Sequence, residues 1–231
     1  MTSSSLIPRR RRPRGAPGTA RRRDAVRTRG DLLSAATTLF AARGYDGTPV
    51  ELIARAAGVN KAMINYHFGG KRGLYAAILQ ETLVPAIARL RPLRNASRPA
   101  AERLEEFVEI YAGTVAARPE LPAMILREAI SGAGRLDRRT ARYLLELFSV
   151  LRGILEQGIR EGAFRRVNPF SAHLALVGSL VFFFSTTATR RRMAREMKLD
   201  LPLPSPGEFV DHVRQITLLG LAAKPARRSH A

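Results

Sequence analysis

The chain contains no cysteine and no tryptophan, and aromatic residues make up only 6% of it. Without cysteine, it has neither disulfides nor thiolate ligands for a metal, which is compatible with a reducing compartment. The charged N-terminus is not followed by an apolar segment, so no secretory signal is recognised. We therefore expect a cytoplasmic protein.

Acidic residues are scarce relative to basic ones: 19 Asp and Glu face 39 Lys and Arg, giving a net charge of +20. This excess indicates a polyanionic partner or an anionic membrane surface. Ten arginines and a single acid, Asp24, lie within residues 1–30. Residues 1–23 lack apolar periodicity, so we expect a disordered basic arm there. Two interpretations of the arm remain: a solvated tail, or a segment adding non-specific DNA affinity.

Patterns of catalytic or metal-binding residues are also missing. None of the four histidines, at positions 67, 173, 212 and 230, belongs to an H-x-x-x-H or H-x-E pattern. No glycine-rich phosphate loop follows a strand, because no segment has the periodicity of a strand. We therefore expect no enzymatic activity, no metal and no cofactor.

One long stretch, residues 167–189, has no charged side chain. Its length would suit a membrane span. Asn168, Pro169, His173 and several Ser and Thr residues within it favour a core helix instead. We therefore expect no membrane association.

Apolar residues recur at helical spacing in most of the remaining chain, which predicts an all-α fold of about nine helices. Three of them are grouped at the N-terminus, and a fourth runs from Lys71 to about Leu90 with Pro85 inside it. The later helices are predicted near 104–115, 119–130, 143–159, 169–188 and 208–221, with a loop over 190–206.

The N-terminal group has recognisable helix boundaries. Its first helix ends at Gly44, a typical helix stop. The segment Thr48-Pro49-Val50-Glu51 predicts the start of the second, with Thr48 as N-cap and Glu51 completing a capping box. Gly58 ends this helix, and Asn60 is the expected N-cap of the third.

The second helix, the turn Ala57-Gly58-Val59 and the third helix have the dimensions of a helix-turn-helix. The outer face of the third helix enters the major groove in such motifs. Lysine suits guanine, asparagine suits adenine, and alanine or methionine suits the thymine methyl group. Tyrosine and histidine near the helix end suit phosphates, although both could instead pack on the first helix. This face holds Lys61, Ala62, Met63, Asn65, Tyr66 and His67.

Lys71 begins the fourth helix, where the positive end of the helix dipole disfavours a cation. A DNA phosphate bound by its amine and by the free backbone N–H groups would offset that cost. We therefore interpret Lys71 as a phosphate contact, with a solvated lysine as the alternative.

The run TPVELIARAAGVNKAMINYHFGGKRGLY, with the preceding LLSAATTLFAARGYDG, resembles the DNA-binding domain of TetR-type transcriptional regulators over roughly residues 27–75. Asn65 departs from the family, which commonly has tyrosine there, and Gly70 replaces a frequent polar cap. The resemblance implies operator-contacting positions at Lys61, Met63, Asn65, Tyr66, His67 and Lys71, with Thr48 as a weaker candidate.

In this family the remaining helices form a bundle that binds a small effector and dimerises through its last two long helices, here 169–188 and 208–221. Small residues at four-residue spacing, Ser171, Ala175 and Ser179, permit close helix approach. An effector pocket could be lined by Phe107, Tyr111, Met124, Arg127, Tyr143 and Phe148, with ordinary core packing as the alternative.

We therefore expect a basic arm (1–23), a DNA-binding domain (24–70), a regulatory and dimerisation domain (71–222) and a tail (223–231). The resemblance implies a homodimeric repressor that binds an inverted-repeat operator on double-stranded DNA and is released by a small-molecule effector. The alternative is a non-specific nucleic-acid-compacting protein that uses the arginine-rich arm.

Overall fold

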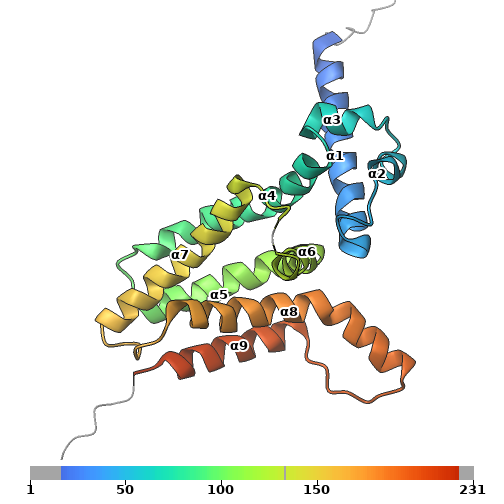
Figure 1. The fold of residues 1–231 in the computed structure, drawn as a ribbon. Coiled ribbons are helices and arrows are strands. Elements are labelled where there is room, and N and C mark those ends of the chain that lie inside the picture. Colours follow the sequence, from blue (N-terminus) through green and yellow to red (C-terminus); the bar gives the residue numbers. More distant parts are fainter. Residues whose placement is uncertain (1–16, 133, 224–231) are drawn as a thin grey trace, which may run out of the picture.

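The computed structural model describes residues 17–132 and 134–223, and within them the chain consists of helices joined by loops (Figure 1). The predicted all-α fold is confirmed, and the described part contains no strand, only an isolated bridge between Phe164 and Ala222. Its elements are α1 (Pro17–Arg43), α2 (Val50–Ala56), α3 (Ala62–Phe68), α4 (Lys71–Leu90), a short 3-10 helix (Arg91–Arg94), α5 (Ala100–Ala117), α6 (Glu120–Ile130), α7 (Arg138–Arg160), α8 (Pro169–Glu196) and α9 (Pro206–Leu221).

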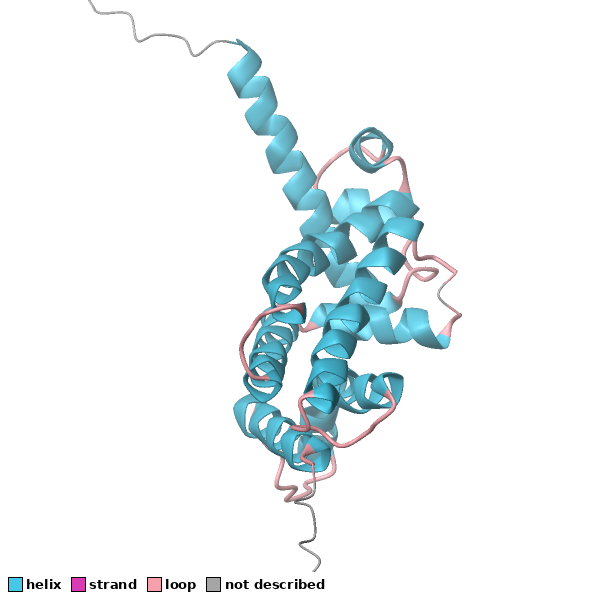
Figure 2. Ribbon diagram, turned by 90° about the vertical axis from the view of Figure 1, so that its left-hand side faces the viewer, coloured by secondary structure: helices cyan, strands magenta, loops and turns pink. Residues whose placement is uncertain are grey.

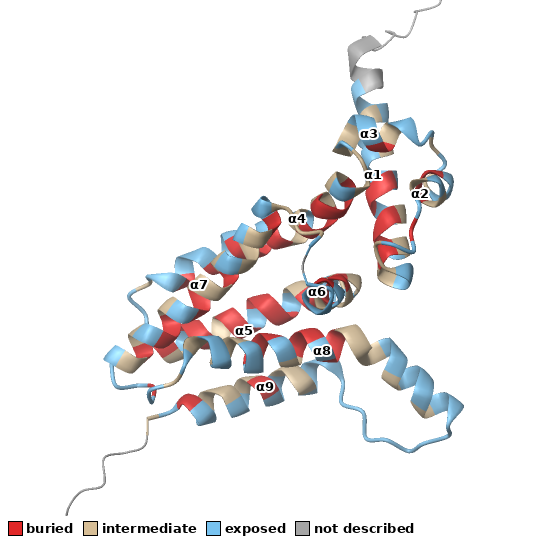
Figure 3. Cartoon of the chain, viewed as in Figure 1, coloured by how far each residue is buried: buried red, intermediate tan, exposed pale blue. Residues whose placement is uncertain are grey.

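Helices α1, α2 and α3 pack around a small apolar core that α4 completes (Figure 3). Phe40 of α1, Ile53 of α2, Ile64 of α3 and Leu74 of α4 are all buried in it. Helices α2 and α3 have seven residues each, too few for stability in isolation. Burial against α1 and α4 therefore holds them in place.

The larger bundle is formed by the helices from α4 to α9 (Figures 1 and 2). Helix α7 packs on α4, α5 and α8, and α9 covers α5 and α8. The core between them includes Phe107, Leu151, Ile154 and Leu180, none of them more than 1% exposed. This core is separate from the one around α3.

Helices α4 and α6 connect the two parts of the molecule. The N-terminal half of α4 packs on α1 and α3, while the helix also contacts α5 and α7. Helix α6 packs on both α1 and α8, and its Leu121 and Met124 are buried with the N-terminal core. A shift of either helix in the bundle would therefore reach the N-terminal domain.

The first helix begins earlier than the sequence indicated. We predicted a disordered arm over residues 1–23, but residues 17–23 are helical, so that prediction is wrong for them. Pro17 is favourable at the first position of a helix, and Ala and Arg are good helix formers. A helix nucleated by the packed part of α1 therefore extends in the N-terminal direction. Residues 1–16 of the predicted arm, and 224–231 of the predicted tail, lie outside the described residues.

Helix α8 also continues past its predicted end near residue 188. Residues 190–196 were expected in a loop but are helical, and only the later part of that segment is irregular. The Arg190 guanidinium donates to the Phe183 carbonyl at 3.0 Å and lies 4.5 Å from the Phe183 ring centroid. Arg192 and Glu196 form a pair one turn apart. These contacts within the helix favour its extension.

Helix α8 is the one helix of the described chain whose length and composition would suit a membrane crossing. In this structure it packs on α5, α6, α7 and α9. Its Leu176, Leu180 and Phe183 are buried in the bundle core. Packing in the bundle accounts for the buried part of this helix, which is 33% of its most apolar window.

Candidate nucleic-acid interface and effector cavity

Helix α3 is positioned by two tight turns. Gly58 adopts the left-handed conformation, with φ of 67°, at the turn between α2 and α3. The Asn60 side-chain oxygen accepts a hydrogen bond from the Ala62 N–H at 2.8 Å, as expected for a capping residue. Gly69, with φ of 69°, ends the helix.

The junction of α3 with α4 depends on a glycine whose role the sequence did not reveal. A Cβ at Gly73 would lie 1.8 Å from the Phe68 carbonyl oxygen. No side chain fits at that distance, so only glycine lets the first turn of α4 lie directly against the end of α3. This backbone contact therefore constrains the angle between α3 and α4.

The predicted capping box at the start of α2 is wrong. Pro49 precedes the first residue of α2, and no side chain caps the helix. Thr48 is fully buried, and its hydroxyl donates to the Gly44 carbonyl at 2.7 Å and to the Leu39 carbonyl at 3.3 Å. The hydroxyl therefore bonds to the last turns of α1 and to the residue that follows it, instead of capping α2. Thr48 is therefore placed as a structural link and not on the outer surface.

The acid expected in that capping box, Glu51, lies on the surface and pairs with Lys61 at 3.3 Å. Hydrogen bonding to its own backbone N–H, and then to Lys61, lowers the pKa of the Glu51 carboxyl. An exposed pair of this kind contributes little to stability. The Lys61 amine could therefore exchange Glu51 for a DNA phosphate or base at small cost.

The outer face of α3 presents most of the predicted contact residues to solvent. Lys61, Ala62, Asn65 and Tyr66 are exposed, and Tyr66 has 77% of its surface accessible. A tyrosine so exposed does not pack on α1, the alternative considered for it. The outer face of α3, with Lys61 just before it, is therefore open to a partner, and three of these four side chains are polar.

The other two predicted contact residues of α3 are partly buried. Met63 packs against the N-terminal core at the edge of the face. His67 is half-buried, and its ring lies edge-on to Tyr66 with the centroids 4.9 Å apart. Its Nε2 atom is buried with no hydrogen-bond partner in the described chain. The His67 ring therefore packs against the Tyr66 ring on the side away from solvent.

Lys71 is the first residue of α4, directly after the turn that follows α3. Its Nζ atom lies 4.3 Å from the centroid of the Tyr45 ring, a cation–π distance. Burial lowers the pKa of the Lys71 amine. No side chain caps α4, because Gly70 precedes it with φ of 114°. Its first backbone N–H groups and the Lys71 amine are therefore together at one helix end, an arrangement that suits a phosphate.

A cavity of about 220 Å³ lies between α4, α5, α6, α7 and α8 in the larger bundle. Most of its lining is aliphatic, and polar side chains enter it from α4 (Thr82), α5 (Tyr111 and Thr114) and α8 (His173). Burial raises the pKa of Tyr111 and lowers that of His173, so both side chains are neutral near pH 7. The cavity is therefore an apolar chamber with a few polar groups, as is typical of small-molecule sites.

One of the six residues predicted to line an effector pocket, Tyr111, lines this cavity. Phe107 is sealed in the core and stacks on Tyr111, and Met124 is buried with the N-terminal core. Tyr143 packs at the edge of that core and contacts Arg139. Phe148 packs on the far side of the His173 ring. Helix periodicity identified buried positions but could not distinguish a cavity wall from solid core.

Arg127, the remaining predicted pocket residue, joins α6 to the N-terminal domain. Its guanidinium donates to the Phe40 carbonyl, near the end of α1, at 3.1 Å. The neighbouring Glu128 is buried and accepts a hydrogen bond from the Tyr75 hydroxyl of α4 at 3.2 Å. The Arg135 guanidinium lies 3.7 Å from Glu128 and also pairs with Asp46. These polar contacts form a link between α6 and the N-terminal domain.

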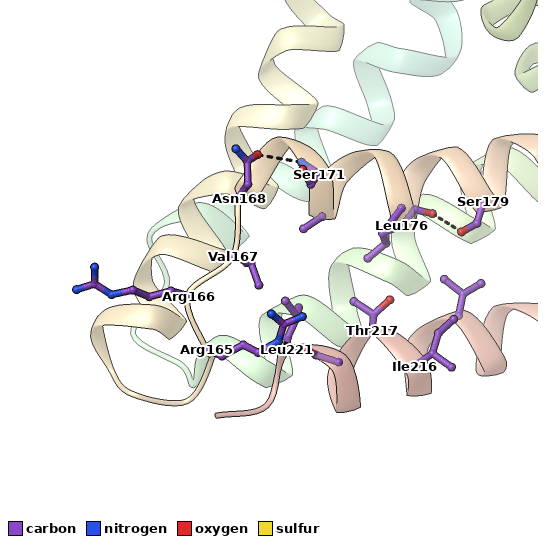
Figure 4. Close-up of a pocket in the computed structure, with 14 residues that line it drawn as sticks. Arg165, Arg166, Val167, Asn168, Ser171, Leu176, Ser179, Ile216, Thr217 and Leu221 are labelled. Atoms are coloured by element: carbon purple, nitrogen blue, oxygen red, sulfur yellow. Dashed lines mark hydrogen bonds between the residues drawn. The ribbon is translucent and has the colours of Figure 1, made fainter. Parts of the chain in front are cut away.

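Apolar side chains are exposed along α8 and α9. Phe170, Leu174 and Phe182, four or eight residues apart on α8, are at least 56% exposed. Ile216 and Leu219 on α9 are 52% and 77% exposed. Beside this row, a groove between the two helices is lined by small residues that include Ser171, Ala175 and Thr217 (Figure 4). Exposed apolar side chains gathered on two neighbouring helices are typical of an interaction surface.

Among the described residues, no three His, Asp or Glu side chains are grouped closely enough to hold a metal ion. The described residues thus offer three candidate functional features: the exposed face of α3, the apolar cavity, and the exposed apolar side chains of α8 and α9.

Comparison with known families gives two matches. The family of bacterial regulatory proteins, tetR family, matches residues 32–78, which include α2 and α3. The tetracyclin repressor-like C-terminal domain matches residues 101–200.

Among individual proteins, the transcriptional repressor NicS of Pseudomonas putida is 26% identical over 87% of this chain and 95% of its own length. The repressor KstR2 of Rhodococcus jostii is 31% identical over 59% of this chain and 68% of its own length. The solved structure of FadR from Bacillus subtilis in complex with stearoyl-CoA has the same fold, with a TM-score of 0.65, 19% identity, and coverage of 83% of this chain and 98% of that one. With its matching motif, its nine described helices and these relatives, the chain belongs to the TetR family of bacterial transcriptional regulators.

Proposed function

We propose that the protein is a homodimeric, cytoplasmic repressor that binds an inverted-repeat operator through α3 and leaves it when a small molecule enters the cavity. The observation that carries the proposal is the polar face of α3, exposed on a short helix that is braced by buried Ile64 and by the Gly73 junction. Its relatives NicS and KstR2 are named repressors. The proposed activity involves binding alone and no catalysis.

In the proposed complex, α3 of each protomer enters one major groove. Asn65 and Lys61 are exposed near the base edges, where amide and amine groups discriminate between bases. Tyr66 and Lys71 flank the helix and bind phosphates, which set its register. Met63 and His67, half-buried, contact DNA only with their outer edges. Thr48, fully buried, acts through the position of α2.

Dimerisation through α8 and α9 would bring two reading helices onto one duplex. The exposed row formed by Phe170, Leu174 and Phe182, together with the groove beside it, offers an apolar surface that a second copy would cover. A two-fold axis through this surface makes the interface self-complementary, as in most homodimers. The two-fold symmetry then matches the symmetry of the inverted repeat.

The effector would act by favouring a geometry of the dimer that does not fit the operator. The cavity touches both helices that continue into the N-terminal domain, since Thr82 and Leu83 belong to α4 and Leu121 and Ile125 to α6. A displacement of α6 would move Arg127, and the hydrogen bond from Arg127 to the Phe40 carbonyl would transmit the movement to the end of α1. Movement of α4 would carry the start of that helix, which lies against α3.

The direct test is selection of bound duplexes from a random DNA pool, followed by titration of the selected operator against variants. Tyr66→Ala and Lys71→Ala should each weaken binding about tenfold or more, and Lys71→Ala should reduce the salt dependence by about one phosphate contact. Arg160→Ala removes one exposed positive charge at the end of α7 and serves as the matched control, with little change expected. Unchanged operator affinity in both Tyr66→Ala and Lys71→Ala would contradict the proposed DNA-binding surface.

The arm-based alternative is tested with a chain that lacks residues 1–16 and keeps α1 intact. Under the proposal, this shortened chain still prefers the selected operator over random DNA. A protein that compacts DNA without specificity would lose most of its binding and show no preference in either form.

A further inference from the structure

The proposed effector cavity has a lining that restricts the chemistry of its ligand. Among the described residues, no Asp, Glu, Lys or Arg lines it. Aliphatic side chains from all five helices form most of its wall, for example Leu79, Leu121 and Val177. An ionised group placed there would lose its hydration and find no counter-charge, which is strongly disfavoured.

Two polar groups in the wall have no partner. Thr82 Oγ1 and His173 Nδ1 are buried and make no hydrogen bond within the described chain. Both residues line the cavity, from α4 and α8. Neighbouring atoms cover both in this structure, so a rotation about χ1 of Thr82 or a flip of the His173 ring is needed to present them. A buried polar group without a partner is costly, and a ligand group that supplies one removes the cost.

Of the two other polar side chains in the lining, Tyr111 and Thr114, the second offers an internal comparison. Thr114 also lines the cavity, but its hydroxyl donates to the Ile110 carbonyl at 2.7 Å. It is therefore already satisfied within α5 and has no need of a ligand. Burial lowers the pKa of His173, so its ring is neutral and can either donate or accept a hydrogen bond.

We propose that the effector is an uncharged, mostly apolar molecule with one hydrogen-bonding group, such as an alcohol or a ketone, which Thr82 and His173 recognise. This inference rests on the proposed effector site. An engineered cavity of about 150 Å³ in another protein holds benzene. The present cavity, at about 220 Å³, would accommodate a molecule somewhat larger than benzene.

The test uses matched probes that share a skeleton: 2-phenylethanol, phenylacetate, 2-phenylethylammonium and ethylbenzene, with the same four end groups repeated on a hexyl chain. Binding to the full chain without DNA is measured by calorimetry and by the shift in melting temperature. The alcohol should bind at least about tenfold more tightly than the carboxylate and the ammonium, and more tightly than the hydrocarbon. Binding of an ionised member as tight as the alcohol, or binding by no neutral member, would overturn the inference.

The variants assign the hydrogen-bonding group. Thr82→Val and His173→Phe should each reduce the advantage of the alcohol over the hydrocarbon, whereas Thr114→Val should keep it. Retention of that advantage in both variants would also overturn the inference. If a variant does not fold, the comparison of probes on the unmodified chain still decides.

Operator binding distinguishes this inference from the proposed function. Neutral probes that bind in the cavity but never change operator affinity would contradict effector control and leave the ligand class standing. Release of the operator by ionised molecules only would contradict the proposed ligand class and leave effector control standing.

Discussion

Thr48 shows how a single side chain can be assigned the wrong partner from sequence. The order Thr-Pro-Val-Glu is typical of a capped helix start, but the hydroxyl bonds instead to the Gly44 carbonyl, just after α1, and to the Leu39 carbonyl within it. The pattern from Thr48 to Glu51 contains no information about those carbonyls, because both precede it: Gly44 lies four residues and Leu39 nine residues before Thr48. Asn60, whose acceptor role depends on a neighbour two residues away, was predicted correctly.

Thr48→Val should lower the free energy of unfolding by about 1–3 kcal/mol, because buried carbonyls lose their donor. Chemical denaturation measures this. Thr38→Val is the matched control: its exposed hydroxyl donates to the Ser34 carbonyl one turn earlier in α1. The control should change stability by less than about 0.5 kcal/mol. Equal effects in the two variants would contradict the structural role of Thr48.

His173 should make stability depend on pH. Burial lowers its pKa in the folded state below the ordinary value of 6.5, so the unfolded chain binds the proton more readily. The contribution of neutral His173 is fully present above pH 6.5 and is lost as the pH falls towards the folded-state pKa. Denaturation midpoints measured between pH 8 and pH 5 should therefore fall more for the native chain than for His173→Phe. Parallel curves would show that His173 titrates alike in both states.

At the scale of elements, the helices follow from local patterns, but their junctions do not. The boundaries of α4, α5, α7 and α9 agree with the predicted segments to within a few residues at most ends. The ends of α1 and α8 were missed, because helices continued through basic segments that composition suggested were irregular. Side-chain contacts within α8, such as that of Arg190 with Phe183, favour its extension.

Gly73→Ala should disturb the junction of α3 with α4. The added methyl group would meet the Phe68 carbonyl oxygen, so we expect a loss of about 1–3 kcal/mol in stability and weaker operator binding. Denaturation and operator titration measure the two effects. Gly30→Ala, in the middle of α1 with nothing within 4 Å of the new Cβ, should instead stabilise by about 0.5–1 kcal/mol. A stable Gly73→Ala chain with native operator affinity would show that α3 tolerates the shift.

At the scale of the whole molecule, the two apolar cores are joined by α4 and α6. This arrangement lets the bundle and the reading half keep separate cores while sharing two helices. The cavity lies against both shared helices, so the proposed effector would be coupled to α3 through them.

Replacing an apolar side chain of the α8 face by a charge should separate the proposed dimer. Phe182→Asp would bury a carboxylate against apolar surface, so we expect the dissociation constant of the dimer to rise at least about tenfold. Sedimentation velocity measures it, and operator affinity should fall because the two reading heads are no longer linked. Leu145→Asp, at an exposed position on α7, should leave the dimer intact. Dissociation by both variants or by neither would place the interface elsewhere.

The sequence by itself determined the all-α class, the helix-turn-helix with Gly58 at its turn, and the exposed face of α3, because these depend on periodicity and on neighbours a few residues apart. Only the tertiary structure decided the role of Thr48, the need for glycine at position 73 and the lining of the cavity, where Tyr111 meets Thr82 and His173. The cavity lining joins helices that are far apart in the chain. Thr48 and Gly73 instead meet backbone groups four and five residues before them, and these come close only because of the angles between consecutive helices. Such angles are set by the summed fit of many side chains.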